Sequence, residues 1–227
     1  MSIDKTLENE TNINIVSQDY FNNFATIDKQ RQYFLELFKN VNGYQVSYEE
    51  KKKLDLFENK TFTYSEVDFD GFKEILDIVN PPNDYVFFDC GSGLGKSLIL
   101  SALLTPCKKL VGREKLTSLV EENKAVFVNY VEFLKRDYSN VLVPELDLKE
   151  DSFVNYSFDD VDVVFVHSTC YDDELMKDLT DKLLQLKQGA SVITITKQID
   201  HPNFECVHKG FYKMNWGSPT VFIYKKI

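Results

Sequence analysis

The stretch FFDCGSGLGKSLIL combines a carboxylate with closely spaced glycines, a pattern that suits the binding of a nucleotide-like ligand. Asp89 ends an apolar run, and Gly91, Gly93 and Gly95 follow at every second position. Glycines allow the backbone to turn tightly and to approach a ligand closely. The stretch also ends in Gly-Lys-Ser, as triphosphate-binding loops do, so the spacing of the glycines has to decide between ligands.

The spacing disfavours two common ligands. A triphosphate-binding loop requires a glycine five residues before Gly95, where Cys90 stands. It also requires a later strand that ends in a magnesium-binding aspartate, but the apolar runs VVFV and VITIT are followed by His167 and Lys197. A dinucleotide-binding loop would place its third glycine at position 96, which is Lys96.

The third hypothesis is S-adenosylmethionine (SAM), whose methionine end carries an ammonium and a carboxylate and whose ribose offers two hydroxyls. Asp89 and the glycine turn could hold the methionine end, and Lys96 could reach its carboxylate. Glu114, after KKLVGR, could accept both ribose hydroxyls, by the geometry known for NAD ribose. Asp147, in PELDL, could face the adenine amino group while Leu148 covers the ring. Three acids at three consecutive strand ends favour a SAM-dependent methyltransferase.

The elements that would position these residues follow the proline pair at residues 81–82. Short, β-branched apolar runs alternate there with amphipathic stretches, which indicates βαβ units and a parallel sheet buried on both faces. The last two strand-like runs have no helix between them and are joined near Met214–Pro219, which favours a closing antiparallel hairpin. We therefore expect an α/β fold of the class I methyltransferase (Rossmann-like) type, with a mostly parallel seven-stranded sheet. Ligands bind such sheets at the carboxyl ends of the strands.

Helical patterns precede the sheet. Apolar spacing predicts a helix over residues 20–41, and Ser47 with Glu50 reads as a capping box that opens a second helix. A third helical stripe, DFDGFKEILDIVN, must end at the prolines that follow it. We predict a helical N-terminal extension over residues 1–60 and a SAM-binding methyltransferase domain over residues 61–227.

Composition limits the classes of molecule that this protein is expected to bind and the compartment in which it is expected to work. The 227 residues carry a net charge of −10, which disfavours direct nucleic-acid binding and suits a basic protein partner. No apolar run is long enough to span a membrane, and the N-terminus lacks the pattern of a secretory signal. The four cysteines show neither metal-ligand nor redox spacing, so we expect no metal site and reduced thiols in an intracellular location, cytoplasmic or nuclear. The oligomeric state stays open.

Residues 60–227 resemble the disruptor-of-telomeric-silencing family, histone-lysine methyltransferases that lack the SET fold. That family carries a Tyr-Gly-Glu motif, a helix, an Asp-x-Gly-Ser-Gly-x-Gly loop and a Gly-x-Glu strand end. The matching segments here are residues 64–66, 89–95 and 112–114. The Lys-x-Gly at residues 187–189 and the closing segment NWGSPTVFIY extend the resemblance.

The resemblance implies a site as well as a fold. Tyr64 and Glu66 would lie on a loop that covers the methionine end of SAM, while the glycine loop, Glu114 and Asp147 would hold the cofactor as described above. The catalytic loop and the closing strand would line a channel for a target lysine. A dry aromatic channel would help that lysine to lose its proton before it attacks the methyl group. The residues assigned to this catalytic channel are His167, Ser168, Tyr171 and Phe222.

Four departures from the family pattern concern the substrate. Ser65 replaces the glycine of Tyr-Gly-Glu, His167 and Ser168 stand at the asparagine positions, and Phe222 stands where a channel tyrosine is expected. The family's basic, DNA-holding tail is not found before Ile227. We predict a protein-lysine methyltransferase whose partner is a histone or another basic protein. Methylation of a non-histone protein or a small molecule, and a catalytically silent cofactor-binding module, remain the alternatives.

Overall fold

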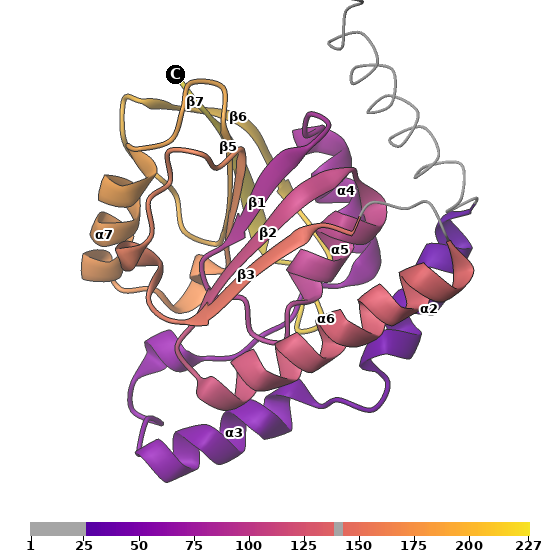
Figure 1. Cartoon of the computed structure of the whole chain (residues 1–227). Helices are drawn as coiled ribbons and strands as arrows, with labels where there is room; N and C mark the ends of the chain where they lie inside the picture. Colours follow the sequence, from indigo (N-terminus) through magenta and orange to yellow (C-terminus); the bar gives the residue numbers. More distant parts are fainter. Residues whose placement is uncertain (1–25, 139–142) are drawn as a thin grey trace, which may run out of the picture.

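The computed structural model describes residues 26–138 and 143–227, which form a seven-stranded sheet between layers of helices (Figure 1). The strand order is β3-β2-β1-β4-β5-β7-β6. Strands β1 to β5 pair in parallel, and β7 pairs antiparallel with both β5 and β6. The predicted mostly parallel sheet with a closing hairpin is therefore confirmed. The strands are β1 Tyr85–Asp89, β2 Cys107–Glu114, β3 Glu145–Glu150, β4 Val163–Val166, β5 Ser191–Ile195, β6 Phe204–Phe211 and β7 Thr220–Lys226.

Helices cover both faces of the sheet because its central strands carry apolar side chains on both sides. On β1, Phe87 packs into one buried cluster and its neighbour Phe88 into the other. The first cluster also holds side chains of the helices before and after β1, and the second holds side chains of the helix after β4. These helices are α4 Phe69–Val79, α5 Lys96–Leu104 and α6 Thr117–Asp137 on the first face, and α7 Asp173–Leu183 on the second.

Two described helices of the N-terminal extension pack against this framework. Helix α2, Ile27–Phe38, places Phe34 and Phe38 in the same buried cluster as the first face of the sheet. It ends before the predicted limit at residue 41, and residues 20–25 of the predicted helix lie outside the described part. Helix α3, Gly43–Leu54, runs beside α6 (Figure 1). The division at residue 60 stays a prediction.

The capping box predicted for α3 is wrong. The helix begins at Gly43, and the side chain of Asn42 accepts the Gln45 N–H at 3.1 Å. Glu50 instead accepts the N–H groups of Thr117 and Ser118, at 2.9 and 2.8 Å, and so caps α6 from a different helix. The first N–H groups of a helix lack partners within it, and a carboxylate there also complements the helix dipole. None of the helices in the described ranges is long and apolar enough to cross a bilayer.

Candidate functional site

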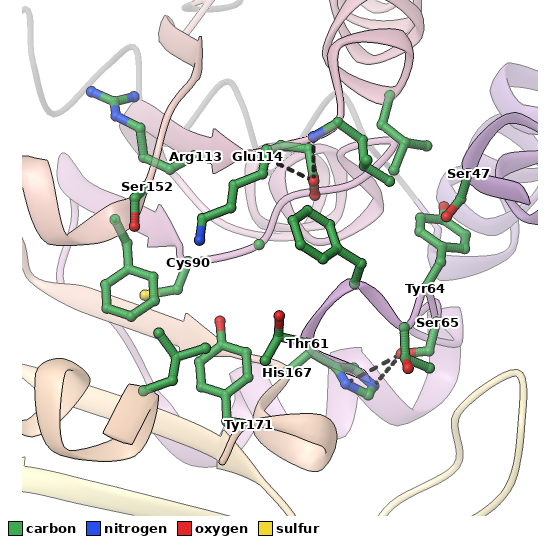
Figure 2. A pocket seen from close by; sticks show the side chains of 18 of the residues that line it. Ser47, Thr61, Tyr64, Ser65, Cys90, Arg113, Glu114, Ser152, His167 and Tyr171 are labelled. Carbon is green, nitrogen blue, oxygen red and sulfur yellow. Dashed lines mark hydrogen bonds between the residues drawn. The ribbon is translucent and has the colours of Figure 1, made fainter. Parts of the chain in front are cut away.

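One pocket lies at the carboxyl edge of the sheet, where the strand order reverses between β1 and β4. Its wall includes Cys90 and Gly91 after β1, Glu114 at the end of β2, Asp151 after β3 and His167 after β4. We call residues 61–67, which close one side of this pocket, the strap; Thr61 to Ser65 are among its lining residues (Figure 2). This edge at the switch point is where open α/β sheets bind ligands, as predicted.

Glu114 is held in a fixed orientation at the pocket wall. One carboxylate oxygen accepts the Gly93 N–H at 3.0 Å, and the other accepts the N–H groups of Lys115 and Leu116, at 2.7 and 3.0 Å. Burial raises the pKa of Glu114, while the backbone N–H groups act in the opposite direction. Each carboxylate oxygen offers about two acceptor directions, so one direction remains free for a ligand hydroxyl, on the oxygen that accepts the Gly93 N–H.

Asp89 lies beneath the glycine loop, and it is not among the residues that line the pocket. Its side chain is almost completely buried, accepts the Gly91 N–H at 3.0 Å and accepts the Ser97 hydroxyl. Burial raises the pKa of Asp89 to about 6, although both hydrogen bonds act to lower it. In the free protein this carboxylate therefore shapes the loop.

The raised pKa gives a prediction for Asp89→Asn. An unfolded Asp has a pKa near 3.9. The folded protein therefore binds the proton more tightly, so the contribution of Asp89 to stability is present below pH 4 and is lost as pH rises from about 4 to 6. Asparagine cannot ionise, so the variant does not lose stability as pH rises. We expect Asp89→Asn to be more stable than the wild type by about 1–3 kcal/mol at pH 7.5. Urea unfolding of both proteins at pH 4.5 and 7.5 tests this prediction. If the free energies of unfolding of variant and wild type differ by the same amount at the two pH values, the prediction is wrong.

The second and third glycines of the loop have conformational and packing roles. Gly93 and Gly95 adopt φ values of +49° and +80°, in the left-handed region that favours glycine. A Cβ on Gly93 would lie 2.8 Å from the Tyr64 ring, and one on Gly95 would lie 2.2 Å from the Asn123 side chain on α6. Gly91 lines the pocket, whereas Gly93 and Gly95 do not. Their predicted contact with a cofactor stays a prediction.

The strap is joined to the glycine loop and to the closing hairpin through Glu66. Its carboxylate accepts the Tyr64 hydroxyl at 2.8 Å, pairs with Lys96 Nζ at 2.6 Å and accepts the Asn215 side-chain amide at 3.0 Å. The ammonium of Lys96 also lies 5.2 Å from the centroid of the Phe38 ring. Tyr64 lines the pocket, while Glu66 and Lys96 form a largely buried ion pair behind it.

The assignment of Asp147 to a strand end is wrong. Strand β3 continues to Glu150, and the carboxylate of Asp147 pairs with the buried Arg113, 3.1 Å away. Leu148 is buried against Gly112, so neither predicted adenine residue lines the pocket. The acid that does follow the strand and line the pocket is Asp151, with Ser152 and Phe153 beside it. The sequence does contain this acid and the nearby aromatic residue, in the segment EDSF, but they can be recognised as pocket residues only when the end of β3 is known.

The four channel residues divide into two pairs. His167 and Tyr171 line the pocket, and the Tyr171 ring stacks on Phe153 with an interplanar angle of 7°. Ser168 is fully buried, and its hydroxyl donates to the Ile195 carbonyl at 2.8 Å. Phe222 lies in the core within β7, because that face of the strand packs under α7. The structure therefore gives no support for a channel role of Ser168 or Phe222.

Burial sets the ionisation of the two remaining channel residues. It lowers the pKa of His167 to about 4 and raises the pKa of Tyr171 well above its ordinary value. Both side chains are therefore neutral at physiological pH. Other pocket residues that the sequence patterns did not single out include Thr61, Phe62, Thr63, Cys90 and Leu175. Nothing in their local sequence marks them, because only the fold brings them together.

Solved structures resemble this chain in fold. TrmN from Thermus thermophilus superimposes with a TM-score of 0.52 at 15% identity, over 69% of this chain and 48% of that one. A SAM-dependent O-methyltransferase from Thermotoga maritima gives a TM-score of 0.52 at 13% identity, over 73% of this chain and 68% of that one. At such identities the likeness shows the fold alone, which is that of class I methyltransferases.

Sequence relatives are more specific. A curated protein of Caenorhabditis elegans, "Histone-lysine N-methyltransferase, H3 lysine-79 specific", is 26% identical over 172 residues. The match covers 72% of this chain but only 18% of that relative, so the chain spans less than a fifth of its length. The profile of the histone methylation protein DOT1 matches residues 44–214, which include the strap, the glycine loop and every strand but β7. The chain is a member of the DOT1 histone methylation family.

Proposed function

We propose that this chain is a SAM-dependent protein-lysine methyltransferase. The observation that carries the proposal is the convergence of Glu114, Asp151 and Gly91 of the glycine loop on one pocket at the switch point of a DOT1-family sheet. Each of these features alone is common, whereas together they match the polar groups of one nucleoside cofactor.

The residues present fit SAM. Glu114 already accepts three backbone N–H groups, so its carboxylate is oriented in advance, and its remaining acceptor direction could take a ribose hydroxyl. Asp151 replaces Asp147 as the acid for the adenine amino group, and Phe153 offers an aromatic surface beside it. Gly91 could let the backbone approach the methionine end of the cofactor, and Tyr64 lines the same pocket. When bound, SAM supplies a methyl group on a positively charged sulfur.

The protein's own part in methyl transfer is mainly positioning and exclusion of water. The attacking lysine nitrogen must be neutral and in line with the methyl group. The aromatic ring of Tyr171 and the uncharged ring of His167 line the same pocket. Such surroundings disfavour a lysine ammonium and would lower its pKa toward the working pH.

A basic protein is the partner class that the charge favours. The chain carries 36 acidic and 26 basic residues, so its net field attracts lysine-rich segments. The C. elegans relative is named for a histone lysine, and we extend a histone target, and with it a nuclear location, to this chain as part of the proposal.

Two measurements on the purified chain test the proposal. Isothermal titration calorimetry with S-adenosylhomocysteine, the product of methyl transfer, should show binding at one site that weakens in Glu114→Ala. Tritiated SAM should then label a protein among histones, nucleosomes or whole lysate. Absence of binding would overturn the cofactor assignment. Binding without any labelled protein would favour the catalytically silent module instead.

A further inference from the structure

His167 lies between two segments that are distant in the sequence. It follows β4 directly and lines the pocket. The strap passes on one side of it with Ser65 (Figure 2). Residues 212–219, which join β6 to β7 and which we call the connector, reach it through Trp216.

The hydrogen bonds assign the tautomer of His167. The indole N–H of Trp216 lies 3.2 Å from Nε2, and because an indole nitrogen only donates, Nε2 must be the unprotonated acceptor. The Ser65 hydroxyl lies within 3.2 Å of both ring nitrogens. With the single lone pair of Nε2 occupied, Nδ1 carries the proton and donates to Ser65 Oγ. The ring therefore has no free acceptor for a proton from a substrate.

The two segments that His167 contacts are also joined to each other. Val67 and Met214 form an antiparallel bridge, and the Asn215 backbone N–H donates to the Glu66 carbonyl at 3.3 Å. The Asn215 side chain adds its bond to the Glu66 carboxylate. Trp216 is nevertheless 41% exposed, so its position depends on few contacts. The bond to His167 is a direct link between this aromatic side chain and the end of β4.

We propose that His167 is a positioning residue, whose ring fixes Ser65 of the strap and Trp216 of the connector and so sets the pocket wall at which the target lysine enters. This role rests on the proposed function. It differs from that of a general base, because both ring nitrogens are engaged and burial keeps the ring neutral. Ser65 and His167 are two of the positions at which the sequence departs from its family's motif, and they contact each other.

Trp216 is the only tryptophan in the sequence, so tryptophan fluorescence reports on the connector alone. His167→Gln keeps one acceptor and one donor but removes the titratable ring, whereas His167→Phe keeps a ring and removes both hydrogen bonds. We expect His167→Gln to retain the emission maximum of Trp216 and methyl transfer within about fivefold, the worth of one altered hydrogen bond. We expect His167→Phe to shift the emission to longer wavelength and to lower kcat by about 10²-fold through misplacement of the substrate.

The control is His201→Phe, because His201 contacts Phe204 and Asn203 outside the pocket and should leave Trp216 emission unchanged. A general base would instead cost about 10²–10⁴-fold in His167→Gln with unchanged emission, and that result would overturn the proposal. Unchanged emission in His167→Phe would overturn it too. The fluorescence comparison needs neither cofactor nor substrate. If the wild type transfers no methyl group, the proposed function fails, but the fluorescence comparison still tests whether His167 holds Trp216 in place.

Discussion

Replacing Glu114 by alanine is expected to weaken binding of S-adenosylhomocysteine by about 10–10²-fold, because a hydrogen bond to a charged group contributes about 1.5–3 kcal/mol and one acceptor direction of the carboxylate is left for a ribose hydroxyl. The carboxylate is already oriented by three backbone N–H groups, so little ordering opposes binding in the wild type. Glu114→Gln keeps the shape and one acceptor oxygen and should lose less. Isothermal titration calorimetry measures both.

The matched control for this prediction is Glu150→Ala. Glu150 is the register partner of Glu114 on the neighbouring strand, but it is exposed and does not line the pocket. Its removal should change the affinity by less than about twofold, as expected of a surface acid. If Glu114→Ala remains folded and binds as tightly as the wild type, the ribose assignment is wrong.

Replacing Lys96 by methionine is expected to lower the free energy of unfolding by about 3–5 kcal/mol, the cost of leaving one member of a buried ion pair alone. The two side chains of the pair are only 16% and 7% exposed. The variant leaves the Glu66 carboxylate with neutral donors only, from Tyr64 and Asn215. Adding Glu66→Gln removes the uncompensated charge, so the double variant should recover most of the loss. Urea unfolding of the wild type, Lys96→Met, Glu66→Gln and the double variant measures the four free energies of unfolding that make up this double-mutant cycle.

An exposed ion pair on the same chain provides the reference. Lys177 and Asp181 are four residues apart on α7 and are 74% and 56% exposed. Lys177→Met should cost less than about 1 kcal/mol, because solvent screens such pairs. Equal losses in Lys96→Met and Lys177→Met would show that the pair behind the strap is no stronger than a surface pair.

Periodicity predicted the architecture because each layer of this fold leaves a local mark. Continuous apolar runs such as YVFFD indicate strands buried on both faces, and the glycine loop follows one of them within a few residues. Glu114 was found in a similar way, as the acid that follows the strand-like segment KKLVGR. These signals depend only on neighbours in the chain, so a single sequence contains them.

The wrong predictions of site residues arose where the residues that contact each other are distant in the sequence. The end of β3 is set by its pairing with β2, where Glu114 faces Glu150, and this extension moved the pocket acid from Asp147 to Asp151. Phe222 was assigned to the channel through the family resemblance, and its place in the buried core becomes visible only when the sheet is assembled. The bond between Glu66 and Asn215 spans 149 positions, and no local pattern announces it.

The carboxylate of Glu50 at the first turn of α6 bears on how far the fold can be divided. A chain trimmed to residues 61–227 would lose the acceptor for the N–H groups of Thr117 and Ser118, and it would bare the surface that Phe34 and Phe38 cover. Helix α6 also supplies Asn123, which donates to the Gly93 carbonyl in the glycine loop. Deletion of α2 and α3 would thus disturb the glycine loop through α6, and these two helices are better regarded as an integral part of the methyltransferase domain than as a separate unit.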